Sequence, residues 1–178
     1  MLRYLLNKML LSMKKRYDYD VRYMQEILSA DLMAFMKYMG FQLMASHSSK
    51  VPAEALAAAR IRAIIWGDCG PCAQLAVNLA LEAKVEPGTV RAIVNLDLDA
   101  LTETTALVTQ FTDMCLAHNP EAEEIRKKIR ALWGTKGLIA IAYSISSAQV
   151  YPALKYTLGY GDACSRIQIN DFLLAPKR

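Results

Sequence analysis

The chain has 178 residues, of which 54% are hydrophobic and 21% charged, and this composition excludes an intrinsically disordered protein. The length is sufficient for one domain with a sizeable core. The formal net charge is only +4 and is spread along the chain, so a basic surface for nucleic acid is excluded.

The first twenty residues carry an amphipathic stripe of leucine and methionine. Arg3, Asn7 and Lys8 interrupt the apolar run, and no small-residue cleavage site follows it. A signal peptide is therefore not expected, and the default location is the cytoplasm. We expect this segment to form a helix that packs on its own domain or on a neighbouring subunit, rather than on a membrane surface.

Helical spacing dominates the first half of the chain after this segment. Leu32 to Met39 show an apolar face that Gly40 is expected to end, and a second helix is predicted from Pro52 to Gly67. Asp68 is a suitable N-cap for the next helix, because its carboxylate can accept a hydrogen bond from the Gly70 N–H.

The second half continues this pattern. Pro87 opens one predicted helix, Thr102 caps another, and Asn119-Pro120 begins a third that Gly134 ends. The uncharged stretch between Lys136 and Lys155 is nearly long enough to raise the question of a membrane span. Its serines, glutamine and proline favour a buried core helix instead, with a kink or break near Pro152.

The predicted fold is therefore a single all-α domain of about seven or eight helices. Residues 1–45 are expected to form a helical extension, and residues 46–178 the helical core. The tail from Cys164 onward is expected to be short and irregular.

Cys69-Gly70-Pro71-Cys72 is the motif that carries chemistry. The two thiols lie three positions apart at a predicted helix start, where free backbone N–H groups and the helix dipole favour a thiolate. Cys69 and Cys72 are therefore the predicted catalytic residues of a dithiol redox site. Helix-start electrostatics slightly favour Cys69 as the more reactive thiol, although the choice between the two remains open.

Four further residues are candidates for a role in or near this site. Asp68 would cap the helix or tune the thiols, and Glu54 is a weaker candidate for a distant base. Cys115 fits a core stripe, and Cys164 is a less certain resolving thiol. The spacing of cysteine and histidine matches no zinc pattern, so neither a metal nor a cofactor is expected.

A family resemblance comes from the residues around this motif. The run RIRAIIWGDCGPCAQLA from Arg60, followed by LALEAKVEPG from Leu79, resembles the carboxymuconolactone decarboxylase family. It is most similar to the alkyl hydroperoxidase D-like (AhpD-like) branch, over roughly residues 46–161. A thioredoxin fold is not expected, although it shares the CGPC sequence, because a strong helix former replaces the strand that should precede it.

The resemblance implies an all-helical homo-oligomer, a trimer or hexamer, that reduces a hydroperoxide and is restored by a thiol reductant. In that branch a histidine follows the second cysteine by four residues and a glutamate precedes the first by twelve, and together they relay protons. Those positions are Ala76 and Ala57 here. The expected function is reduction of a hydroperoxide or exchange with a partner disulfide. The alternatives are a non-catalytic helical binding module and, more weakly, a carboxymuconolactone decarboxylase-like enzyme.

Overall fold

The computed structural model describes residues 1–162 and 166–177, and in these residues the fold is all-α as predicted. Eight α-helices, one short 3-10 helix and two short strands make up the described chain. In chain order they are α1 (Leu2–Tyr17), α2 (Arg22–Ala30), α3 (Leu32–Ala45), α4 (Ala53–Trp66), α5 (Gly70–Glu82), α6 (Pro87–Asn95), η1 (Leu98–Ala100), α7 (Glu103–Leu116), α8 (Ala122–Thr157), β1 (Ile167–Ile169) and β2 (Phe172–Leu174).

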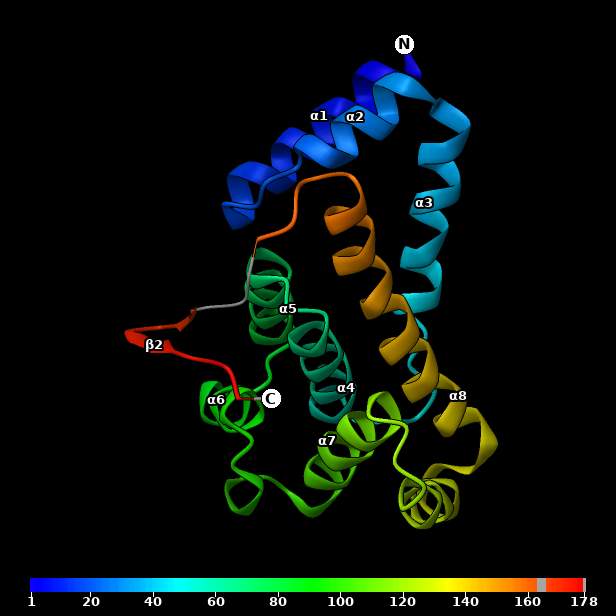
Figure 1. The fold of residues 1–178 in the computed structure, drawn as a ribbon, viewed down its shortest axis with the longest axis vertical. Helices are drawn as coiled ribbons and strands as arrows, with labels where there is room; N and C mark the ends of the chain where they lie inside the picture. Colours follow the sequence, from blue (N-terminus) through cyan, green and yellow to red (C-terminus); the bar gives the residue numbers. More distant parts are fainter. Residues whose placement is uncertain (163–165, 178) are drawn as a thin grey trace.

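Helix α4 is the centre of the larger core and packs against α5, α6, α7 and α8 (Figure 1). Its alanines make this possible, because Ala55, Ala58 and Ala59 are completely buried and let the neighbouring helices approach closely. The apolar face predicted from Pro52 onward is therefore correct, but α4 is buried on nearly all sides.

A second core cluster lies between α1, α2, α3 and the end of α8. We call it the N-terminal cluster; its buried residues are Leu10, Tyr19, Val21, Tyr23, Met24, Leu28, Phe35 and Tyr38. Helices α1 and α2 lie side by side at one end of the molecule, and α3 runs back along α8 (Figure 1). The N-terminal segment therefore packs on its own chain, with Leu10 as its buried anchor.

Helix α8 joins two predicted helices, and they meet at Gly134 as predicted, but the kink or break expected near Pro152 is absent. Gly134 adopts φ +67°, which bends the helix there, whereas Pro152 lies inside the helix without a break in the backbone dihedrals. Among the described helices, α8 alone is long and apolar enough to span a membrane, and 44% of its most apolar window is buried inside the structure.

Two further expectations are corrected. Helix α3 does not end at Gly40 but continues to Ala45, because a single exposed glycine costs a helix only about 1 kcal/mol. The expected irregular tail contains a hairpin instead, in which β1 and β2 pair antiparallel. Ile167 and Ile169 are completely buried and anchor β1 against the larger core.

An ion pair connects α4 to α7 beside this core. The Arg62 side chain is completely buried and donates to both carboxylate oxygens of Asp113, at distances between 2.8 and 3.1 Å. The Trp66 Nε1–H donates to the same carboxylate at 3.1 Å, and Arg62 also donates to the Lys177 carbonyl at 2.7 Å. The Asp113 carboxylate therefore joins α7 to α4, and the Arg62 guanidinium joins both helices to the C-terminal segment.

Candidate active site

Cys69 and Cys72 form a disulfide at the start of α5, with their Cα atoms 5.2 Å apart. Cys69 is the N-cap residue, and its Sγ accepts a hydrogen bond from the Cys72 N–H at 3.3 Å. Pro71 lies in the first turn, where its missing N–H leaves no donor unpaired. The local sequence thus places both sulfurs where the backbone favours negative charge on sulfur.

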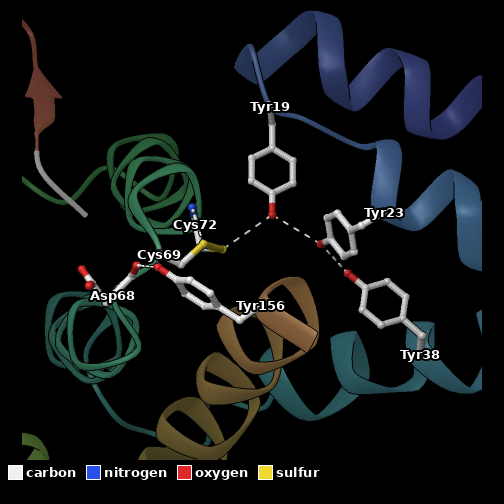
Figure 2. The surroundings of a disulfide bond; sticks show 7 residues. All are labelled: Tyr19, Tyr23, Tyr38, Asp68, Cys69, Cys72 and Tyr156. Carbon is white, nitrogen blue, oxygen red and sulfur yellow. Dashed lines mark hydrogen bonds between the residues drawn. A yellow bond between two sulfur atoms is a disulfide. The ribbon is translucent and has the colours of Figure 1, made fainter. Parts of the chain in front are cut away.

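The residues around the disulfide are held by the C-terminal half of α8 and by the segment that follows it. The Tyr156 hydroxyl donates to the Asp68 carbonyl at 2.8 Å (Figure 2), and the Gly70 N–H donates to the Asp162 carbonyl at 3.0 Å. A Cβ on Gly67 would lie 2.7 Å from the Pro152 ring, so only glycine allows this close approach. The cap prediction is corrected here, because Cys69 caps the helix and the Gly70 N–H is taken by Asp162.

A cavity of about 510 Å³ lies between the two core clusters and reaches the disulfide from one side. Cys72 lines this cavity, whereas Cys69 does not. The two side chains are 3% and 0% exposed, so the cavity is the route by which a small molecule reaches sulfur. Access therefore favours Cys72 as the attacking thiol, against the slight preference for Cys69 that helix-start electrostatics gave.

Three tyrosine hydroxyls lead away from Cys72 (Figure 2). The Tyr19 hydroxyl lies 3.8 Å from the Cys72 Sγ and 3.3 Å from the Tyr23 hydroxyl. The Tyr23 hydroxyl in turn lies 2.9 Å from the Tyr38 hydroxyl. Burial raises the pKa of Tyr19 to about 12, and it raises the pKa of Tyr23 and Tyr38 as well. All three phenols therefore stay protonated at neutral pH, and Tyr19 is positioned to donate to a thiolate.

Tyr19→Phe is expected to slow alkylation of the reduced dithiol about tenfold at neutral pH, because a hydrogen bond to a charged group stabilises it by roughly 1.5–3 kcal/mol. Iodoacetamide kinetics over a pH series measure this, and the midpoint of the profile should move to higher pH. Tyr38→Phe is the matched control, because it removes a hydroxyl that is separated from the Tyr19 hydroxyl by that of Tyr23. Equal effects of the two substitutions would contradict a direct role of Tyr19.

Lys155 is a buried cation behind the same tyrosines. It is completely buried and its Nζ has no hydrogen-bond partner among the described residues, although it lies 5.0 Å from the Tyr19 ring centre and 5.5 Å from that of Tyr23. Desolvation lowers the pKa of Lys155, and the positive charge of Arg22 lowers it further. The negative charges of Asp20 and Asp162 partly oppose this shift. The folded state thus binds the proton less tightly than the unfolded chain.

Lys155→Met is expected to stabilise the protein by about 1–3 kcal/mol at neutral pH, because it removes an unsatisfied buried polar group. The lysine's penalty is absent above its unfolded pKa of about 10.4, grows as pH falls below that value and becomes constant below the lower folded pKa, so the gain should shrink toward about pH 10. Urea unfolding at both pH values measures it, with Lys37→Met on the exposed face of α3 as control. A loss of stability at neutral pH would overturn this account.

The remaining predicted residues lie elsewhere. Glu54 is in the first turn of α4, whereas the disulfide follows the last turn, so the length of the helix separates them. Ala76 lines the cavity and Ala57 is buried in the larger core, so neither position supplies a proton relay. Cys115 is partly buried on α7, and burial raises the pKa of its thiol. Cys164 lies outside the described residues.

Tyr19, Tyr23, Tyr38 and Arg60 were not predicted as site residues, and all four line the cavity. Tyr19 lies between α1 and α2, about fifty positions before Cys72, and no local spacing connects the two. In the described part of the chain, no group of three or more histidine, cysteine or carboxylate residues is arranged to hold a metal ion. No protein-family model, curated protein or solved structure matches this chain.

Proposed function

We propose that this protein is a dithiol redox enzyme that reduces a small hydroperoxide, with Cys72 as the attacking thiol and Cys69 as the resolving thiol. The observation that carries the proposal is a CxxC pair joined at a helix start, of which one sulfur lines an apolar cavity. The pair is compatible with reversible oxidation, since each thiol has its partner within bonding reach and needs no large rearrangement.

The oxidative half of the reaction balances with the two thiols and the hydroperoxide. The Cys72 thiolate attacks the terminal oxygen of R–O–OH, so that an S–O bond forms and the O–O bond breaks. The alkoxide takes a proton and leaves as the alcohol. The Cys69 thiolate then attacks the Cys72 sulfenic sulfur, the S–S bond forms, and hydroxide leaves and becomes water. A dithiol reductant supplies two electrons and two protons to restore the pair.

A small oxidant is favoured over a partner protein's disulfide by the burial of both sulfurs. Exchange with a protein requires a sulfur at the surface, whereas a hydroperoxide can enter the cavity. The cavity wall is largely methionine, leucine and tyrosine, which favours a hydroperoxide with an apolar body. For the same reason, the reductant is expected to be a small dithiol.

The resemblance to the AhpD-like family supports the same proposal and extends it to a cytoplasmic homo-oligomer, a trimer or hexamer. Exposed apolar side chains on α1 support association with a second copy, since Leu2, Leu5 and Leu11 are each about half exposed. The family's histidine and glutamate are absent at Ala76 and Ala57. In this proposal, the buried Tyr19 hydroxyl stabilises the Cys72 thiolate instead.

The proposal is tested by mixing fully reduced protein with cumene hydroperoxide under anaerobic conditions. We expect one equivalent to oxidise Cys69 and Cys72 to the disulfide with release of one cumyl alcohol, faster than the same reaction of a free Cys-Gly-Pro-Cys peptide. Peptide mapping identifies the bond, and a Cys115→Ser, Cys164→Ser background removes the other thiols. A rate no greater than that of the peptide would contradict the enzymatic function and favour a binding module.

A further inference from the structure

Arg60 places an uncompensated cation on the cavity wall. Its Nη2 donates to the Ala45 carbonyl at 2.8 Å, while its Nε is buried without a hydrogen-bond partner. No carboxylate of the described residues pairs with it. Desolvation lowers the pKa of Arg60, as expected for a buried charge without a counter-ion. An anion bound here would supply the missing acceptor and charge.

The cavity is polar around Arg60 and apolar elsewhere. Gln42 and Tyr151 line it on the Arg60 side, where the Gln42 amide donates to the Tyr151 hydroxyl at 2.9 Å. The apolar lining comes mostly from α1, α3 and α5, and includes Met9, Met13, Met39, Leu75 and Leu79. A matching ligand has one anionic group and an apolar body.

Arg60 and Cys72 lie at different places on the cavity wall, with tyrosines between them. The Tyr151 ring lies 6.0 Å from the Tyr38 ring, and the Tyr38, Tyr23 and Tyr19 hydroxyls lead on to Cys72. A ligand anchored at Arg60 would therefore extend an apolar chain along the cavity toward sulfur. The volume of about 510 Å³ lies within the usual range for small-molecule pockets.

We infer that this cavity binds an apolar carboxylate, with the carboxylate on the Arg60 guanidinium and the hydrocarbon chain on the methionine and leucine wall. A guanidinium fits this group because it can donate two parallel N–H bonds to one carboxylate. The hydroperoxides reduced here would then be those of apolar carboxylic acids, a step that rests on the proposed function.

Calorimetric titration of the oxidised protein with decanoate tests the inference. We expect saturable binding that Arg60→Gln weakens by roughly tenfold or more, because the charged hydrogen bonds are lost. Arg60→Lys keeps the charge and should retain part of the affinity. Decyltrimethylammonium has a similar chain with the opposite charge and should bind far more weakly to the wild type. Equal binding of the two amphiphiles, or no effect of Arg60→Gln in a protein with unchanged circular dichroism, would overturn the inference.

The two proposals are separated by repeating the titration on a Cys69→Ser, Cys72→Ser double variant, which has no redox chemistry. Decanoate binding there, together with no peroxide reduction by the wild type, would uphold the carboxylate site and refute the proposed function. Rapid reduction of cumene hydroperoxide without decanoate binding would uphold the proposed function and refute the carboxylate site.

Discussion

Cys72→Ser is expected to abolish the reaction with hydroperoxide, whereas Cys69→Ser should react once and stop at a sulfenic acid on Cys72. The reason is access: Cys72 lines the cavity and its Sγ lies beside the Tyr19 hydroxyl, while Cys69 is completely buried and does not line the cavity. A sulfenic acid without its resolving thiol accumulates and can be trapped with dimedone. Mass spectrometry of the trapped peptide measures both outcomes.

Cys115→Ser is the matched control, because this thiol is on α7 and does not line the cavity. It should leave the rate of disulfide formation unchanged. The opposite pattern, with a dimedone adduct on Cys69 in Cys72→Ser and no reaction of Cys69→Ser, would assign the attack to Cys69. The electrostatics of the helix start would then decide which thiol attacks, and not the access of the hydroperoxide to sulfur through the cavity.

Asp113→Ala should lower the free energy of unfolding by about 3–5 kcal/mol, the usual cost of leaving one charge of a buried ion pair without its partner. The completely buried Arg62 guanidinium would lose three hydrogen bonds, and Trp66 would lose its acceptor. Urea unfolding of the reduced and oxidised protein measures the effect.

The control for this substitution is Glu124→Ala, which breaks the exposed pair with Lys127 and should leave the unfolding midpoint nearly unchanged. A double variant, Arg62→Met with Asp113→Leu, should recover much of the loss because no unpaired charge remains. A loss in Asp113→Ala no larger than that in Glu124→Ala would contradict the structural role of this pair.

Elements with strong local signals were predicted well. Pro87 begins α6, Thr102 caps α7 through its side chain, and the long apolar segment after Gly134 is a core helix. The position of the thiols at a helix start also follows from local sequence, since Gly67 ends α4 and Pro71 suits the first turn of α5. These features depend on residues within a few positions of one another.

Features that depend on distant contacts were not predictable in this way. Asp68 was expected to cap α5, but the Asp162 carbonyl, more than ninety positions away, takes the Gly70 N–H. The tail was expected to be irregular, but burial of Ile167 and Ile169 against the larger core organises it as a hairpin. Tyr19 lies in no local motif, and Arg60 begins the run that carries the family resemblance without any signal of a binding role, so their positions on the cavity wall depend on the tertiary fold.

The most direct test of a reversible dithiol site is to equilibrate the protein with mixtures of reduced and oxidised dithiothreitol and quantify the Cys69–Cys72 peptide at each ratio. We predict one reversible two-electron transition in which these two cysteines oxidise together and Cys115 remains a thiol. Cysteines 69 and 72 that remain separate thiols in the most oxidising mixture, and also after excess hydroperoxide, would contradict the account.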